Sequence, residues 1–246
     1  MEIRFDGKRA LVTGAGKGIG RGIAIALAKC GASVTAMTRS QADLDSLKAE
    51  IPSVETICLD IHDWNKTDKL LSPLSAFDLL VNSAGVSSAE SCLEISPEAY
   101  DDVMMINHRA SLQITKIVAK KMIEKGQGGS IVNLSSIASL QGLKNHAVYA
   151  STKGALDSYT KVAALEFAQH KIRVNCVNPT VVLTPMAKKF WEQSETRDSM
   201  LARIPLGRFL EVEDVVNPVL FLLSDKSAMI NGITLPIDGG ALAALV

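Results

Sequence analysis

Tyr149 and Lys153 are the two residues whose types and spacing point most directly to chemistry. In a helix, a separation of four places two side chains on one face, one turn apart. A tyrosine phenol ionises at about pH 10, so it is a poor acid or base at neutral pH unless a nearby cation favours the phenolate. The Lys153 ammonium would supply that charge. The pair therefore indicates a tyrosine that gives and takes a proton, although such pairs also arise by chance on half-exposed helices.

A glycine-rich turn follows a short β-branched segment near the start of the chain. The backbone N–H groups of such a strand-to-helix turn can face a pyrophosphate, and glycine lets the chain approach it closely. The spacing fits neither G-x-G-x-x-G nor a P-loop. The turn predicts a dinucleotide site formed by Gly14, Lys17, Gly18, Ile19 and Gly20.

The residues at the end of the second expected strand indicate whether the site binds NAD or NADP. An NAD site carries Asp or Glu there for the ribose 2′-hydroxyl, whereas this chain has Thr38 and Arg39. Arg39 and Lys17 can pair with a 2′-phosphate, the arginine through a planar fork and the lysine as a point charge. The sequence therefore predicts NADPH/NADP+ as cofactor. The alternative is that both cations are ordinary surface residues.

A pair of serines at the end of the fifth expected strand completes a reaction site. Ser135 and Ser136 would meet the start of the Tyr149 helix at the carboxyl edge of a sheet. A carbonyl oxygen could accept hydrogen bonds from Ser136 and Tyr149 while hydride reaches the carbonyl carbon. The tyrosine proton would then neutralise the alkoxide. This combination predicts an oxidoreductase that acts on a small-molecule carbonyl.

With these motifs in this order, nearly the whole chain resembles the short-chain dehydrogenase/reductase family. The further matches are Asn82-Ser83-Ala84-Gly85, Asn107 and Asn178-Pro179. The resemblance implies a catalytic tetrad, in which the asparagine holds a water that links the lysine to solvent. The members of that tetrad are Asn107, Ser136, Tyr149 and Lys153. Ser83 and Thr180 depart from the usual asparagine and glycine, and neither change removes a reacting group.

The resemblance also implies the residues of the cofactor cleft. Asp60 would contact the adenine, and Val182 and Thr184 would bind the nicotinamide carboxamide. The full implied set is Gly14, Lys17, Gly18, Ile19, Gly20, Thr38, Arg39, Asp60, Asn82, Gly85, Tyr149, Lys153, Pro179, Val182 and Thr184.

Within the family, segments such as residues 170–182 and 235–240 are most similar to the reductases of L-xylulose and of α-dicarbonyls. This similarity implies NADPH-dependent reduction of L-xylulose to xylitol, and of α-dicarbonyls such as diacetyl. The alternatives are reduction of another carbonyl, such as a 3-oxoacyl thioester, and a nucleotide-binding regulator without catalysis.

The substrate side of the site is expected just before Tyr149 and on a lid at about residues 186–203. Side chains there could bind sugar hydroxyls, although the histidine and the tryptophan could equally have packing roles. The candidate substrate-binding residues are Ser136, Asn145, His146, Tyr149 and Trp191.

Short β-branched runs alternate with amphipathic stretches along the chain, which predicts the elements that position these residues. Helices are expected at 42–50 and 98–125, each after a serine N-cap. Strands separated by helices run parallel, so we expect an α/β fold in a single domain, 1–246. This would be a Rossmann-type doubly wound parallel sheet with helices on both faces and the motifs at the carboxyl ends of the strands. The strands are expected at 9–13, 33–38, 54–60, 78–82, 130–134 and 173–177.

The composition limits the classes of partner. Lysine plus arginine equals aspartate plus glutamate at 26 each, so no overall charge favours nucleic acid. No apolar stretch reaches the roughly 18 residues of a transmembrane helix. The four cysteines form no CxxC pair, which favours a cytoplasmic protein, and no histidine has a partner at metal-ligand spacing.

Apolar positions on several sides of 97–125 and 149–169 suggest subunit contacts, and a homotetramer is the usual family arrangement.

Overall fold

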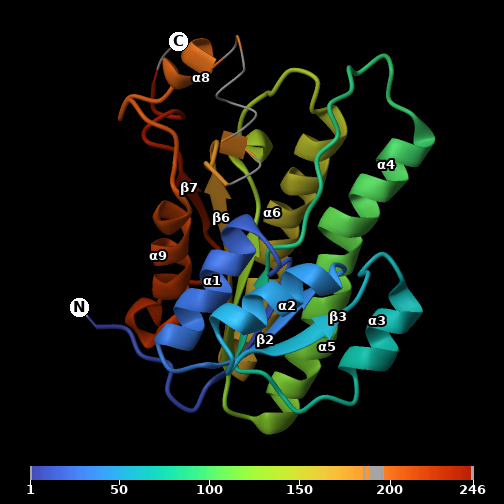
Figure 1. The fold of residues 1–246 in the computed structure, drawn as a ribbon, viewed down its shortest axis with the longest axis vertical. Helices are drawn as coiled ribbons and strands as arrows, with labels where there is room; N and C mark the ends of the chain where they lie inside the picture. The colour runs from blue at the N-terminus through green and yellow to red at the C-terminus, as the bar shows by residue number, and fades with distance from the viewer. Residues whose placement is uncertain (1, 185–186, 189–194, 196, 245–246) are drawn as a thin grey trace.

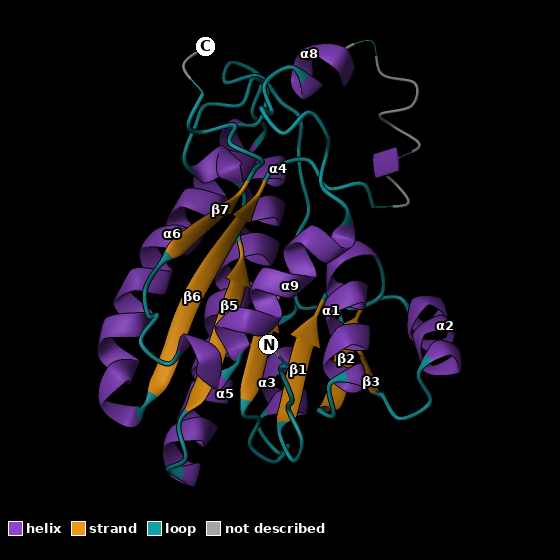
Figure 2. Cartoon of the chain, turned by 90° about the vertical axis from the view of Figure 1, so that its left-hand side faces the viewer, coloured by secondary structure: helices purple, strands orange, loops and turns teal. Residues whose placement is uncertain are grey.

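Seven parallel strands form one sheet in the computed structural model, which describes residues 2–184, 187–188, 195 and 197–244. The strand order is β3-β2-β1-β4-β5-β6-β7, and the strands point the same way (Figure 2). The order reverses between β1 and β4, which opens a crevice at the carboxyl ends. The strands are β1 Arg9–Thr13, β2 Ser33–Thr38, β3 Glu55–Cys58, β4 Leu79–Asn82, β5 Gly129–Leu134, β6 Ile172–Pro179 and β7 Thr234–Ile237.

Helices cover both faces of the sheet, with α1 and α9 together on one side and α4, α5 and α6 on the other (Figure 1). None of the helices in the described ranges has the length and apolar character that a membrane span requires. The helices are α1 Gly18–Lys29, α2 Gln41–Glu50, α3 Trp64–Leu71, α4 Pro97–Met104, α5 Ala110–Lys125, α6 Ala147–Phe167, α8 Arg197–Leu201 and α9 Val212–Leu223.

Side-chain alternation along the strands divides the interior into two cores. In β1, Ala10 and Val12 face the core that also contains Ile23 of α1. Leu11 points the other way, into the core that contains Ile114 of α5. Both faces of β1 are therefore buried, and its residues 10–12 are all apolar, as expected for a strand inside a parallel sheet. The predicted doubly wound α/β fold is confirmed.

Two features of the fold differ from the sequence-based expectation. The stretch 98–125 is not one helix, because a π-helical turn, Met105–Arg109, separates α4 from α5. The strand β7 was not predicted. The serine caps were predicted correctly, since Ser40 accepts a hydrogen bond from the Asp43 amide and Ser96 accepts one from the Ala99 amide.

Candidate active site

The glycine turn is held against the segment that follows β4. Gly14 has a φ of +65°, and a Cβ there would lie 2.7 Å from the Cα of Ala84. The Thr13 hydroxyl accepts hydrogen bonds from the amides of Ser83 and Ala84, both at 3.1 Å. A side chain at residue 14 would therefore separate the two segments, and glycine is required for both its conformation and its size.

A cleft of about 980 Å³ lies at the carboxyl ends of β1, β2, β4, β5 and β6. The structure brings most of the predicted site residues together on its walls. These are Gly14, Lys17, Gly18, Ile19, Gly20, Thr38, Arg39, Asp60, Gly85, Ser136, Tyr149, Lys153, Pro179, Val182 and Thr184.

Asn82 is the exception among the residues expected on the cofactor cleft. It is buried beneath the cleft, where its Nδ2 donates to Thr115 Oγ1 at 2.9 Å and to Asn133 Oδ1 at 2.8 Å. Successive side chains of a strand point to opposite faces, so Asn82 points toward α5 and its neighbour Ser83 lines the cleft. Asn82 thus joins β4, β5 and α5 and does not form part of the cleft surface.

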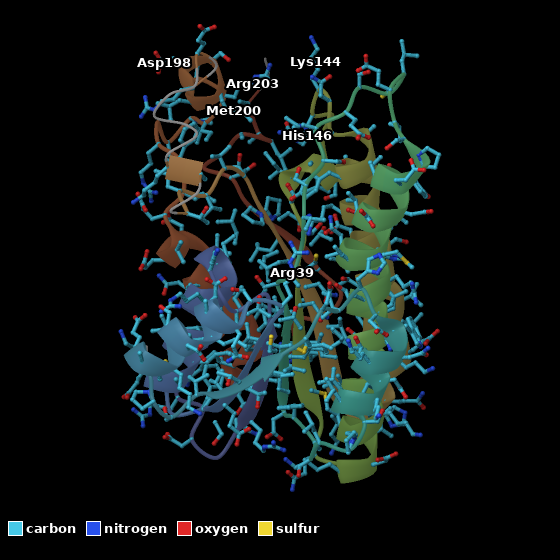
Figure 3. The ribbon with its side chains drawn as sticks, turned by 45° about the vertical axis from the view of Figure 1, so that its right-hand side comes forward. Arg39, Lys144, His146, Asp198, Met200 and Arg203 are labelled. Carbon is cyan, nitrogen blue, oxygen red and sulfur yellow. The ribbon has the colours of Figure 1, made fainter. Side chains whose placement is uncertain are left out.

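The cleft wall near α2 carries the two cations expected at a 2′-phosphate. Arg39 is exposed and has no ion-pair partner within the described ranges, and it lies below the level of Lys144 and His146 in Figure 3. Lys17 Nζ lies 3.4 Å from Asp43 Oδ2. Asp43 was not among the predicted site residues, although its place in the first turn of α2, three residues after the Ser40 cap, was a usable signal.

Tyr149 and Ser136 approach each other from two elements. Tyr149 lies in the first turn of α6, and Ser136 is the N-cap of a short 3₁₀ helix, Ile137–Ser139, after β5. Burial raises the pKa of the Tyr149 phenol, and the hydrogen bond with Ser136 lowers it by less. This net direction is opposite to the one expected from the Lys153 charge, because loss of water outweighs the other contributions.

Lys153 lies one turn further along α6, with its Nζ 5.6 Å from the centroid of the Tyr149 ring. Its ammonium donates a hydrogen bond to the Leu134 carbonyl oxygen at 2.8 Å. Burial lowers its pKa to about 8. The ammonium is therefore still the main form at neutral pH, and it lies close enough to the phenol to stabilise a phenolate.

Asn107 lies in the π-helical turn and is completely buried. Its Nδ2 donates to the Val86 carbonyl oxygen at 2.8 Å, and its Oδ1 accepts from the Val86 amide at 2.8 Å. Both Asn107 Oδ1 and Lys153 Nζ adjoin Gly85. Asn107 thus fixes the backbone of the cleft wall beside Lys153.

The residues expected to contact substrate are only partly brought together. The His146 ring makes an edge contact with the Tyr149 ring at 6.2 Å between centroids, and Asn145 precedes it with a φ of 61°. Figure 3 shows His146 and Lys144 on one side of the upper end of the molecule, opposite α8 and Arg203. The helix α8 belongs to the expected lid, and Trp191 lies outside the described residues.

Comparison with known proteins identifies the family. A family model described as enoyl-(acyl carrier protein) reductase matches residues 14–241. The solved structure of a short-chain type dehydrogenase/reductase from Mycobacterium ulcerans has a TM-score of 0.93 at 29% identity, over 98% of this chain and 92% of that one. The chain belongs to the short-chain dehydrogenase/reductase family. As a member of this family, it is an oxidoreductase that acts on CH–OH and C=O groups.

This dehydrogenase/reductase is also similar to characterised enzymes over its whole length. It is 56% identical to the L-xylulose reductase of Bos taurus, over 99% of this chain and 100% of that protein. It is 47% identical to carbonyl reductase [NADPH] 2 of Sus scrofa, again over 99% of this chain and 100% of that protein.

Proposed function

We propose that this enzyme is an NADPH-dependent carbonyl reductase that converts L-xylulose to xylitol and reduces α-dicarbonyls such as diacetyl. The observation that carries the proposal is the placement of Ser136, Tyr149 and Lys153 on the same cleft as the glycine turn. The similarity to L-xylulose reductase over the full chain supports this choice of substrate. The runner-up activity, reduction of a 3-oxoacyl thioester, would use the same three residues.

The residues of the cleft fit NADPH. A Cβ at Gly18 would lie 2.8 Å from Thr184 Cγ2, so the glycine keeps open the space between the turn and the opposite wall. The turn would hold the pyrophosphate, Asp60 the adenine, and Val182 and Thr184 the carboxamide. Lys17 and Arg39 would hold the 2′-phosphate. Bound there, NADPH supplies a hydride for a carbonyl carbon.

The stabilisation of the carbonyl oxygen and the proton transfer are carried out by Ser136, Tyr149 and Lys153. The Ser136 and Tyr149 hydroxyls donate hydrogen bonds to the substrate carbonyl oxygen and stabilise the charge that develops on it. Because burial raises the Tyr149 pKa, the phenol is protonated at neutral pH and can donate that proton to the alkoxide. The Lys153 ammonium then stabilises the phenolate that remains.

We propose that the proton returns to Tyr149 through Lys153 and a water held by Asn107. The Asn107 side chain is occupied by Val86 and Thr152. We propose that the water is held by the Asn107 main-chain carbonyl in the π-helical turn, which also accepts a hydrogen bond from the Ser111 hydroxyl at 3.1 Å.

Asn145 and His146 are proposed to bind the hydroxyls of a sugar substrate, and Trp191 to cover it from the lid. The edge contact between His146 and Tyr149 supports this assignment, because a carbonyl oxygen bonded to Tyr149 would have its neighbouring hydroxyls near His146.

Initial rates of NADPH oxidation with three carbonyl substrates test the proposed function. We expect kcat/KM for L-xylulose and for diacetyl to exceed that for an acetoacetyl thioester by at least about tenfold, since only the small substrates match the polar contacts proposed for the site. A higher kcat/KM for the thioester would transfer the assignment to the runner-up. No NADPH oxidation with any of the three would favour a regulator.

We propose that the single domain assembles as a homotetramer and acts in the cytoplasm. Apolar side chains on the outer faces of α4 and α6 support an assembly, since Tyr100, Val162 and Leu165 are 45%, 50% and 80% exposed in one chain. Sedimentation equilibrium would measure the molar mass of the assembly and therefore the number of subunits. The four cysteines are free thiols, which supports a reducing compartment, and cell fractionation tests this location.

A further inference from the structure

Asp157 is a buried carboxylate that the proposed reaction does not use. It lies on α6, four residues after Lys153 and thus on the same face of the helix, and it is 6% exposed. A buried charge is costly unless it is hydrogen-bonded and balanced by an opposite charge. The carboxylate therefore requires an explanation.

Among the residues that the structure describes, the hydrogen bonds to Asp157 come from neutral donors. Its Oδ2 accepts from the Ser139 hydroxyl at 2.6 Å and from Asn178 Nδ2 at 2.9 Å. Its Oδ1 accepts from the Cys176 thiol at 3.2 Å and from Asn178 Nδ2 at 3.2 Å. Burial raises the pKa of Cys176, so the thiol stays protonated and can donate. Accepting at both oxygens is the behaviour of an ionised carboxylate.

Lys153 is the cation that balances this charge. It is 5% exposed, and its ammonium donates to a main-chain carbonyl. Within the described ranges, neither Lys153 nor Asp157 forms a salt bridge. The titratable groups around the ammonium are Tyr149 and Asp157 on α6 and Cys176 on β6. Tyr149 and Cys176 are neutral at pH 7, so Asp157 is the negative charge that opposes the effect of burial.

The donors that bind Asp157 also hold the turn that carries Ser136. The Ser139 hydroxyl lies 2.7 Å and Asn178 Nδ2 lies 3.2 Å from the Ser136 carbonyl oxygen. Asn178 Nδ2 also lies 2.9 Å from the Ser139 hydroxyl. Asp157 therefore connects the helix of Tyr149 and Lys153 to the Ser136 turn.

We propose that Asp157 is a positioning residue of the reaction, whose carboxylate keeps Lys153 in its ammonium form and fixes the Ser136 turn against α6. The kinetic part of this inference rests on the proposed function, whereas the charge of Lys153 can be measured without any substrate.

The test is an NMR pH titration of protein labelled with ¹³C at the lysine Cε. The resonance of Lys153, assigned by its loss in Lys153→Met, is expected to titrate near pH 8, well separated from exposed lysines at about 10.4. In Asp157→Asn the midpoint should fall by about two pH units, as Coulomb's law gives for charges about one helical turn apart at an effective dielectric constant of about 20. An unchanged midpoint would overturn the proposal.

Ser139→Ala is the matched control, because it removes the hydroxyl that lies within hydrogen-bond distance of both Asp157 and the Ser136 carbonyl, and it removes no charge. We expect its Lys153 midpoint to stay within about 0.3 pH units of the unmodified enzyme. If Asp157→Asn does not fold, Asp157→Glu replaces it. This variant keeps the charge and should keep the midpoint, and a fall of about one unit or more would contradict the proposal.

Diacetyl kinetics measure the consequence for turnover. In Asp157→Asn, kcat should fall about tenfold with little change in the KM for NADPH, and its loss at alkaline pH should begin at lower pH, because a lower Lys153 pKa removes the ammonium earlier. An unchanged kcat and pH profile would contradict the positioning role. An unmodified enzyme that does not reduce diacetyl would count against the proposed function, and the titration would still decide the role of Asp157.

Discussion

Replacing Tyr149 with phenylalanine is expected to lower kcat for L-xylulose on the order of a thousandfold. The change removes only the hydroxyl that donates the proton and leaves the ring and its neighbours in place. NADPH affinity, measured by quenching of protein fluorescence, should change less than about twofold, because the phenol contributes to catalysis far more than to cofactor binding.

Tyr159→Phe provides a matched control on the same helix. Tyr159 is also largely buried, and burial raises its pKa to about 12, but it hydrogen-bonds Thr115 and does not line the cleft. The same substitution there should leave kcat within about threefold of the unmodified enzyme. Near-normal turnover by Tyr149→Phe would show that another group donates the proton.

The cofactor preference is expected to reverse when Thr38→Asp is combined with Arg39→Leu. In the unmodified enzyme, charge-assisted contacts of about 1.5–3 kcal/mol each should favour NADPH over NADH by tenfold to several hundredfold in kcat/KM. The new carboxylate would repel the 2′-phosphate and accept hydrogen bonds from a free 2′-hydroxyl. Comparison of kcat/KM for the two coenzymes measures the reversal.

The ion pair between Lys17 and Asp43 adds to this expectation. To bind a 2′-phosphate, the Lys17 ammonium must share or exchange its contact with Asp43, so Arg39 should make the larger contribution. Raised salt should weaken NADPH binding more than NADH binding. Lys48→Leu is the control, since Lys48 is an exposed cation of α2 that does not line the cleft. Equal kcat/KM for both coenzymes in the unmodified enzyme would contradict the assignment of NADPH as the preferred cofactor.

Elements with a strong local pattern could be predicted from the sequence, and those shaped by their surroundings could not. The strands β1 and β2 lie at their predicted bounds because a short, mainly apolar run that contains β-branched residues defines each of them. The strand β7 was missed because it is four residues long and contains Pro236, which a sheet tolerates at an edge. A π-helical turn shifts the register of the side chains that follow it, but apolar positions lie on several sides of 97–125, so the interruption at Asn107 could not be recognised.

The residues of the site also differ in how well the sequence predicts them. The glycine turn and the pair Tyr149 and Lys153 have fixed spacings, which a sequence shows directly. Asn82 matched a motif, yet its direction depends on the alternation at the end of β4, and the structure places it beneath the cleft. Asp157 has a role only because β6 and the turn after β5 bring neutral donors to it. Such long-range contacts have no signal in one sequence.

Transfer of deuterium from labelled cofactor is the most direct test of the central claim. The enzyme would be incubated with L-xylulose and NADPH that carries deuterium at both C4 positions, and the product analysed by mass spectrometry and NMR. Hydride transfer to the carbonyl carbon predicts xylitol with a single carbon-bound deuterium, and Tyr149→Phe should yield almost none of it. Formation of unlabelled xylitol, or no xylitol from the unmodified enzyme, would contradict the proposed reaction.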